Sequence, residues 1–298
     1  MMNYVDLSGR AKFWMTGSDR LRYLNGQLTN DLNALVLGQA MYAFALTAKG
    51  KLAGDLYLRA VNDAFLIDAP AELRDSLLAR LERYVVADDV AIEDVTEQFY
   101  LWHFLEPLAP AETPSGVIRN ESSRFRRAGT DLFFAAEPAV PAGVEPAEPL
   151  GAAEAETLRV EAAMPKWGHE LDENVLPQEL GLDELAISYT KGCYLGQEVV
   201  SRIKSVGHVN RRLVKLRPLE GPALRPGLAL TAAGQPAPAA GSVTSVAPLP
   251  VGGQVYALGF ARRTLAEPGN RLGVVDPATS GLIGTVEVCS LGVTRANP

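Results

Sequence analysis

The sequence predicts an α+β protein with a small β-barrel at its C-terminal end. In the N-terminal third, helical periodicity and strand-like alternation follow each other as helix, hairpin, helix and strand, which is typical of an antiparallel sheet covered by helices. From residue 207 onward, short β-like stretches separated by Gly, Pro and Asn favour a barrel. The 298 residues, 47% of them hydrophobic, can bury more than one core, so two or three compact units are expected.

The first elements follow from the spacing of apolar residues. Residues 18–35 predict an amphipathic helix, with Ser18 as its N-cap and leucines at helical spacing along one face. Residues 51–69 alternate apolar and polar side chains on either side of Asn62 and Asp63, two residues that favour turns. This second pattern predicts a β-hairpin.

The next segments are marked by prolines. Residues 70–86 predict a second helix, because Pro70 is tolerated in a first helical turn and an apolar stripe follows it. A strand is expected at 90–95. Residues 137–153 contain four prolines without apolar periodicity, which predicts a surface linker between two structured parts, and residues 232–241 predict a flexible loop.

Charge and cysteine content exclude several classes of protein. The net charge of −7 argues against a general affinity for nucleic acid, so any RNA contact requires a local basic patch. The N-terminus does not resemble a secretory signal, and no apolar run approaches the ~18 residues of a membrane span, so we expect a cytoplasmic protein without membrane contact. The two cysteines, Cys193 and Cys289, exclude a disulfide framework and are expected to be free thiols.

One of these cysteines lies in an unusual setting, since residues 191–198 are KGCYLGQE. A helical face formed by Val199, Ile203 and Val206 follows, which places Cys193 in the turn before a helix N-terminus. The helix dipole and the nearby Lys191 favour a thiolate, and Gly192 and Gly196 permit a sharp turn and close approach to a ligand. Two interpretations remain open: a reactive or ligand-facing thiolate, and a buried, inert thiol.

Two further segments are candidate sites. Residues 202–217 contain six cations and no acid, which would attract a carboxylate-bearing molecule or an RNA backbone, although a solvated strand face explains them equally well. Residues 158–173 combine Arg159 and Trp167 with carboxylates, which suits a heteroaromatic ligand, but a helix end followed by a polar loop is the simpler interpretation. The chain has no metal-binding motif and no phosphate loop, so neither a metal nor a nucleoside triphosphate is expected.

With these stretches described, the sequence resembles the YgfZ-type folate-binding family, a relative of the glycine-cleavage T-protein (aminomethyltransferase). Residues 191–198 match the family signature K-G-C-Y-x-G-Q-E. The likeness extends over most of the chain and is poor at about 100–150. The other stretches that carry it are YLNGQLTNDLNAL and LTAKGKLAGDL near the start, LRVEAAMPKWG and PQELGL before the signature, and the terminal barrel.

The resemblance implies a fold, a cofactor and partners. The fold would be a three-domain GcvT/YgfZ-like ring with a C-terminal β-barrel: an N-terminal α+β folate-binding domain at 1–98, a middle α+β region at 99–206 that ends in the signature, and the barrel at 207–298. Tetrahydrofolate or a one-carbon derivative would bind in a central channel faced by the cysteine loop. Family members are implicated in the assembly or repair of iron–sulfur enzymes, including enzymes that thiolate tRNA.

The resemblance also assigns residue roles. Cys193 becomes the functional thiol, and Asp55 falls where the T-protein has an aspartate pair, one of which it uses in one-carbon transfer. Arg159 matches a T-protein arginine that is a candidate contact for the folate carboxylates, and Arg202 from the basic segment would anchor the same anionic tail. The remaining cofactor-binding roles of the signature fall on Lys191, Gly192, Tyr194, Gly196, Gln197 and Glu198.

Two departures from the T-protein affect the expected activity. Gly54 stands at the other place of the aspartate pair, and residues 124–138 lack the tyrosine and glutamate that the T-protein supplies to the pterin. We therefore expect a tetrahydrofolate-binding accessory protein that supports iron–sulfur cluster assembly or repair and, through it, tRNA modification. The alternatives are a tetrahydrofolate-dependent one-carbon transferase and a weak tRNA-binding module that uses residues 202–217.

Overall fold

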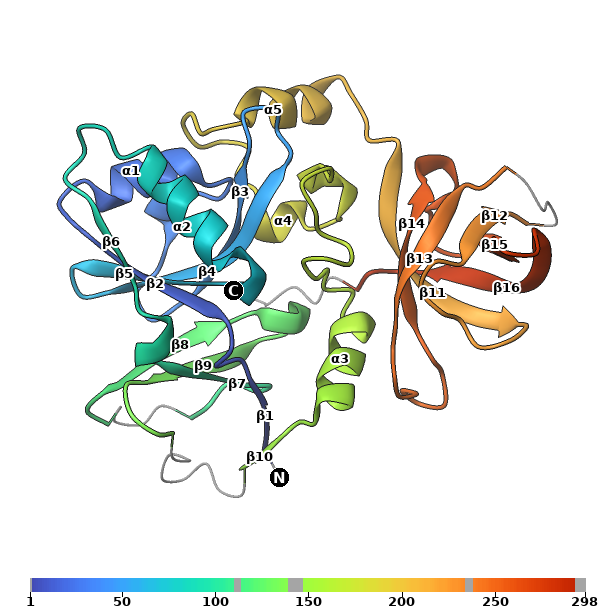
Figure 1. Cartoon of the computed structure of the whole chain (residues 1–298), viewed down its shortest axis with the longest axis horizontal. Helices are drawn as coiled ribbons and strands as arrows, with labels where there is room; N and C mark the ends of the chain where they lie inside the picture. The colour runs from blue at the N-terminus through green and yellow to red at the C-terminus, as the bar shows by residue number, and fades with distance from the viewer. Residues whose placement is uncertain (1, 110–113, 139–146, 234–237, 293–298) are drawn as a thin grey trace. The chain divides into compact units, whose positions relative to one another are not determined.

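The computed structural model describes residues 2–109, 114–138, 147–233 and 238–292, which form two compact units. Of the described residues, unit 1 consists of those up to Leu150 together with Leu182–Ser201, and unit 2 of Gly151–Gly181 together with those from Arg202 to Gly292. Figure 1 draws the chain from blue at its N-terminus to red at its C-terminus. The domain boundaries proposed from the resemblance, at 98/99 and 206/207, remain predictions.

The first sheet of unit 1 is antiparallel and has the strand order β3-β4-β5-β2-β6. The predicted hairpin is confirmed as β4 and β5, which turn at Asn62 with a positive φ of 49°. The predicted strand after the second helix is confirmed as β6. The bounds are β2 Ala11–Thr16, β3 Met41–Leu46, β4 Leu52–Val61, β5 Ala64–Ala69 and β6 Ala91–Asp94.

Two helices accompany this sheet, α1 (Arg20–Gln27) and α2 (Arg74–Arg83), which Figure 1 shows beside each other. The second helix is confirmed: Leu77 and Leu81 are fully buried, and a Cβ at Gly54 of β4 would meet the leucine side chains of this segment. The phenol of Tyr23 on α1 donates a hydrogen bond to the carbonyl of Leu81, which joins the two helices.

The first predicted helix is too long. It ends at Gln27 because the next residue, Leu28, is extended and bridges to Ala45, so the chain leaves the helix to pair beside β3. Residues 32–34 form a separate 3₁₀ turn. Ser18 does not cap the helix; its hydroxyl donates to Asp89 at 2.8 Å. Periodic leucines alone could not show that long-range pairing interrupts the helix.

The second sheet of unit 1 has the strand order β10-β1-β7-β9-β8, with β10 parallel to β1 and the other pairs antiparallel. The segment predicted at 137–153 as a linker between two structured parts contains the boundary between the two units, at Leu150 and Gly151. It is not without regular structure, however, because β10 pairs with β1 and a helix begins at Ala152; residues 139–146 lie outside the described residues. The bounds are β1 Met2–Asp6, β7 Tyr100–Phe104, β8 Val117–Ser122, β9 Gly129–Phe134 and β10 Ala147–Pro149.

Unit 2 contains the helix α3 (Ala152–Glu161) and the predicted barrel, which is confirmed as a closed barrel of six strands in the order β11-β14-β13-β12-β15-β16. Valines and leucines such as Val214, Leu230 and Val286 fill its core. The predicted loop at 232–241 separates β12 from β13, and its residues 234–237 lie outside the described residues. The bounds are β11 Arg211–Glu220, β12 Ala229–Ala232, β13 Gly241–Val246, β14 Ala257–Arg262, β15 Arg271–Asp276 and β16 Gly281–Cys289.

The remaining helices are α4 (Asp183–Ala186) in unit 1 and α5 (Gln197–Ser205), which begins in unit 1 and ends in unit 2. The apolar face predicted for this helix, Val199, Ile203 and Val206, is not its buried face. Val200 is the fully buried residue of α5, and Val206 lies beyond the helix end and is 84% exposed. Within the described parts of the chain, no helix has the length and apolar character that crossing a bilayer requires.

Candidate functional site

The cysteine of the signature lies on an exposed loop of unit 1, between α4 and α5. The predicted helix after it is confirmed, and Cys193 stands four residues before its start at Gln197. Both Cys193 and Gly192 are exposed, and the thiol is free. The interpretation of Cys193 as a buried, inert core thiol is therefore wrong, and the thiol is open to a reaction partner.

Lys191 holds this loop to another part of unit 1. Four oxygens of residues 25–30 surround its buried ammonium and share its three N–H donors: the carbonyl of Asn25 at 2.7 Å and its side-chain oxygen at 2.8 Å, the carbonyl of Leu28 at 3.0 Å and that of Asn30 at 2.6 Å. Burial lowers the pKa of Lys191 to about 8, and the charge of Asp31 opposes that shift. Since its donors are occupied, Lys191 acts here as a positioning residue for the loop.

Other residues of the signature also shape the loop. Tyr194 is buried, and burial raises the pKa of its phenol to about 12. Gly196 has a φ of +86°, and a Cβ there would lie 2.6 Å from the carbonyl oxygen of Thr47. Gly192 needs neither a positive φ nor extra space, so the sharp turn expected of it is wrong. The Gln197 amide donates to the carbonyl of Gly192 at 3.4 Å.

The loop packs on the β3–β4 turn. Gly50 in that turn has a φ of +71°, and a Cβ there would come within 2.6 Å of the Val199 side chain on α5. Glu198, between this contact and the loop, is exposed. The hairpin that supports the Cys193 loop is therefore the same hairpin that carries Asp55.

Asp55 is a buried carboxyl that forms no ion pair with any residue that the structure describes. It is 6% exposed, its Oδ2 accepts a hydrogen bond from the Tyr42 hydroxyl at 3.1 Å, and its Oδ1 has no partner among the described residues. Burial raises the pKa of Asp55, and the charge of Arg10 opposes that shift without cancelling it. A buried acceptor oxygen that no hydrogen-bond donor contacts costs stability, so the presence of Asp55 at this position points to a ligand.

A cavity of about 170 Å³ in unit 1 adjoins the tyrosine that binds Asp55. Tyr42 and Tyr57 both line it, with ring centroids 4.7 Å apart, and the buried Tyr57 hydroxyl has no partner within the described ranges. Their strands pair so that Tyr42 lies opposite Tyr57. Sequence reasoning missed both tyrosines, although Tyr57 shares the strand face of Asp55 at the period of two.

Gly54, where the T-protein pattern has a second aspartate, faces away from this polar side. A Cβ at Gly54 would meet the methyl groups of Leu73 and Leu77 at 3.4 and 3.5 Å. A carboxylate at position 54 would thus be buried against leucines, on the opposite face of β4 from Asp55. The aspartate that this chain keeps is the one on the polar face.

Unit 1 also contains a buried charge cluster, which sequence reasoning did not predict. Asp68 accepts from Arg10 at 2.5 Å, Arg59 at 2.7 Å and Arg124 at 2.6 Å, and Arg124 also donates to Asp131 at 2.9 Å. Burial alone would raise the pKa of Asp68, but the arginine charges outweigh it and hold the pKa far below its usual value. Because Asp68 is on β5 and Asp131 on β9, the cluster joins the two sheets.

Arg159 and Arg202 belong to unit 2. All five N–H donors of Arg159 are occupied: Glu156 takes two, and Glu170, the carbonyl of Met164 and the Ser245 hydroxyl take one each. The side chain is 7% exposed, so a folate carboxylate could bind it only by replacing one of these partners. Arg202 is exposed on the last turn of α5.

The basic segment 202–217 does not form one uniform positive face. On β11, Arg211 pairs with Glu179 at 3.0 Å, Arg212 with Glu267 at 3.7 Å, and Arg217 with Glu287. Acids distant in the sequence thus neutralise three of the six cations. No group of three or more His, Cys, Asp or Glu side chains suited to a metal ion occurs in the part of the chain that the structure describes.

Sequence comparison with known proteins shows the family of this chain. Residues 2–110 match the family described as the GCVT N-terminal domain. The tRNA-modifying protein YgfZ of Escherichia fergusonii is 31% identical over 230 residues, which cover 71% of this chain and 71% of that protein. The chain belongs to the YgfZ family. A YgfZ protein of Yersinia pestis is 27% identical over 230 residues, 71% of this chain and 70% of that protein.

The YgfZ-family chain is also similar to aminomethyltransferases. That of a Nostoc species is 28% identical over 303 residues, 90% of this chain and 79% of that protein. The solved structure of aminomethyltransferase T from Bartonella henselae matches with a TM-score of 0.82, 18% identity and coverage of 99% of this chain and 87% of that chain. The expected T-protein-like fold with a C-terminal barrel is thereby confirmed.

Proposed function

We propose that this YgfZ-family protein binds tetrahydrofolate or a one-carbon derivative and acts in the cytoplasm as an accessory factor for iron–sulfur cluster assembly or repair. Through its iron–sulfur partner enzymes it would support tRNA modification, in keeping with the names of its relatives. The observation that carries the proposal is Asp55, a buried carboxyl whose Oδ1 has no partner among the described residues.

The surroundings of Asp55 fit the pterin end of a folate. A pterin is a flat heteroaromatic ring with N–H donors, and Tyr42 and Tyr57, which line the cavity, offer aromatic surface and a hydroxyl. Asp55 does not line the cavity itself but lies behind Tyr42, to which it is hydrogen-bonded, and has an unused acceptor. The cavity of about 170 Å³ is smaller than a typical ligand pocket of roughly 300–1,000 Å³, so it suits the ring and not the whole cofactor. When bound, tetrahydrofolate would accept a one-carbon unit and its one-carbon derivatives would supply one.

The chain's own residues have distinct tasks in this proposal. Asp55, with its raised pKa, accepts a ring N–H and can hold or release a proton there. Cys193, exposed on its loop, would attack an electrophilic one-carbon or sulfane-sulfur donor, so that the group passes to its sulfur while the thiol proton and the donor's leaving group depart. Lys191, Tyr194 and Gly196 keep the loop in place. The tail-anchoring roles of Arg159 and Arg202 stay predictions: the five donors of Arg159 are occupied within unit 2, whereas Arg202 is exposed.

Calorimetry with tetrahydrofolate and its formyl derivative tests the folate site. Asp55→Asn keeps the shape of the side chain but replaces one acceptor oxygen with a donor, so we expect binding to weaken at least about tenfold. Asp63→Asn is the matched control, because Asp63 is exposed at the tip of the β4–β5 turn. Equal affinities of wild type and Asp55→Asn, or no binding of either folate by wild type, would refute the proposal.

The role of the thiol is tested by complementation in a strain that lacks this protein. Cys193→Ala should bind folate normally but fail to restore iron–sulfur enzyme activity, since the alanine cannot react. Cys289→Ala removes the other, half-buried thiol in the barrel and should complement fully. Full complementation by Cys193→Ala would remove the thiol from the mechanism.

A second candidate function is a tetrahydrofolate-dependent one-carbon transferase of the aminomethyl type. It is favoured by the likeness to an aminomethyltransferase over 90% of the chain and by the retention of Asp55 on the polar face of β4. Incubation of the purified protein with tetrahydrofolate and aminomethyl donors, whose transferred carbon is already at the formaldehyde level, should then yield methylenetetrahydrofolate with release of the amine nitrogen as ammonia. Absence of turnover with every donor would leave the accessory role as the sole proposal.

A further inference from the structure

A separate pocket of about 400 Å³ lies on the barrel of unit 2, over the starts of β11 and β13 and the end of β14. Small residues form one side of it, among them Ala240 and Gly241, and Gly241 has no room for a Cβ, which would lie 1.9 Å from the carbonyl oxygen of Phe260. This close strand contact keeps the pocket open between two arginines. Asn210 and Arg211 belong to the basic segment 202–217, which the sequence offered as a possible RNA contact, whereas the lining residues of β13 and β14 have no role above.

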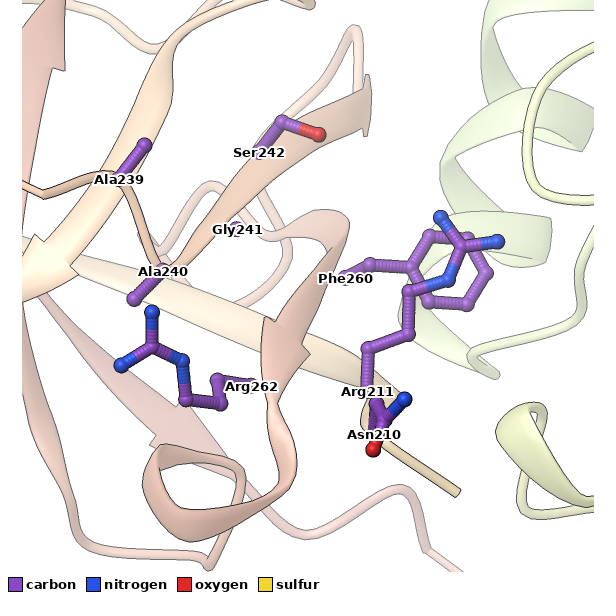
Figure 2. Close-up of a pocket in the computed structure, with 8 residues that line it drawn as sticks. All are labelled: Asn210, Arg211, Ala239, Ala240, Gly241, Ser242, Phe260 and Arg262. Atoms are coloured by element: carbon purple, nitrogen blue, oxygen red, sulfur yellow. The ribbon is translucent and has the colours of Figure 1, made fainter.

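Arg262 is the cation of this pocket that is not neutralised. Its side chain is exposed and makes no ion pair or hydrogen bond with any of the described residues. Figure 2 shows it turned toward Ala240 at one side of the pocket. The arginines of β11 each have an acidic partner, so Arg262 is the group available to an added oxyanion.

Arg211, at the other side, is held flat. Its guanidinium lies over the Phe260 ring at 4.3 Å from the centroid, and its Nε donates to Glu179 at 3.0 Å. Figure 2 shows the two groups overlapping. The Phe260 ring is covered, at 6% exposure, but the Arg211 side chain remains 42% exposed. Arg211 is thus a fixed, planar cation that stays partly accessible to solvent, and such guanidinium planes are surfaces on which nucleobases stack in RNA recognition.

We propose that this pocket binds one nucleotide of a single-stranded RNA, with the base stacked on Arg211 and a backbone phosphate on Arg262. Asn210, at the same rim, supplies an amide for the base edge. A cation for phosphate and a planar group for a base together select a nucleotide, whereas either alone would not. The inference goes beyond the proposed function, because it places direct RNA contact in the barrel and needs no folate.

The acidic character of the chain sets the expected strength of this contact. With a net charge of −7, only a local site can hold RNA, and a site with a single unpaired arginine should bind weakly and with a shallow salt dependence. The predicted logarithmic slope is about −0.7 for each phosphate contacted on a single strand. A broad basic surface would give a much steeper slope.

The test is fluorescence anisotropy with a labelled single-stranded RNA of about ten nucleotides at about 50 and 200 mM salt. Wild type should bind, and Arg262→Gln should weaken binding at least about fivefold and flatten the salt slope. Arg211→Lys keeps the charge but loses the planar face, so it should also weaken binding. Ala239→Glu, which adds a carboxylate at the exposed rim, should abolish it.

Arg271→Gln is the matched control, because it removes the same charge from an exposed position of the barrel outside the pocket. Equal loss in Arg262→Gln and Arg271→Gln, or no binding by wild type at the lower salt, would overturn the proposal. Binding of adenosine monophosphate in the pocket without binding of RNA would also overturn it, in favour of a free nucleotide. Folate titrations of the same variants separate this result from the fate of the Asp55 site.

Discussion

Asp55 and Asp68 are buried carboxyls on one face of one sheet, yet they have opposite surroundings. Asp68 lies opposite Tyr57 across the β4–β5 ladder, and Asp55 precedes Tyr57 by two residues on β4. Three arginines contact Asp68, whereas Asp55 accepts one bond from a tyrosine and leaves Oδ1 without a partner in the described part of the chain. The pKa of Asp68 is driven far down, and burial drives that of Asp55 up.

The contrast separates structural charge from functional charge. A carboxylate that is fully paired inside a protein contributes to holding the fold, because removal of one partner leaves the others buried and uncompensated. A carboxyl buried without such pairing costs stability, and proteins keep such groups where a ligand or reaction needs them. On this ground we assign Asp68 to the joining of the two sheets and Asp55 to the ligand.

The largest effect should follow from breaking the paired carboxylate. Asp68→Asn leaves three arginines without their common anion, so we expect the free energy of unfolding near neutral pH to fall by about 3–5 kcal/mol. Because the folded-state pKa is depressed, the stabilisation by Asp68 is present above its unfolded pKa of about 3.9 and is lost as pH falls toward the folded value. Urea unfolding across pH measures both effects, with Asp63→Asn as control.

The signature loop contains a similar contrast between two glycines, Gly196, which packs closely against the β3–β4 turn, and Gly192, which has free space around it. Gly196→Ala would force a Cβ to 2.6 Å from the Thr47 carbonyl at a positive φ, and should destabilise the protein by about 1–3 kcal/mol. Gly192→Ala, in open space, should change the unfolding free energy by less than about 0.5 kcal/mol. Equal effects in thermal unfolding would mean that the loop is not held against the β3–β4 turn.

An effect of opposite sign, smaller than that at Gly196, is expected at Asp55. Asp55→Asn replaces a group that is costly to ionise with a neutral amide, so it should stabilise the ligand-free protein by about 0.5–2 kcal/mol near neutral pH. The raised folded-state pKa means that the stability of wild type falls as pH rises from about 3.9 through that pKa. The gain of the variant should therefore shrink in acid, and a destabilised variant at neutral pH would contradict the comparison.

The sequence could predict the parts of the molecule that depend on local spacing. The β4–β5 hairpin, α2, the barrel strands and the helix after Cys193 all follow from periodicity and turn residues within short windows. The sequence could not decide whether the Cys193 thiol is exposed or buried, because that depends on how Lys191 fastens its loop to residues 25–30. The end of α1 at Gln27 depends on pairing beside β3, which no local pattern reveals.

The polar interior could not be predicted, because its members come from distant segments. Arg10, Asp68 and Arg124 meet only after two sheets have formed, and each alone is an ordinary charged residue in the sequence. The same holds for Arg159, which the resemblance marks as a folate contact but whose five donors are occupied by partners such as Glu170 and Ser245. Likewise, the register of β11 and β14 places Arg211 opposite Arg262.

The central claim is that Asp55 is the unpaired carboxyl that receives the ligand, and carboxyl-carbon NMR of protein with labelled aspartate tests it most directly. The Asp55 and Asp68 signals can be assigned from Asp55→Asn and Asp68→Asn. We predict that in the free protein Asp55 titrates above its ordinary pKa of about 3.9, and that tetrahydrofolate shifts its signal while leaving that of Asp68 in place. Folate binding with an unchanged Asp55 signal would contradict the account.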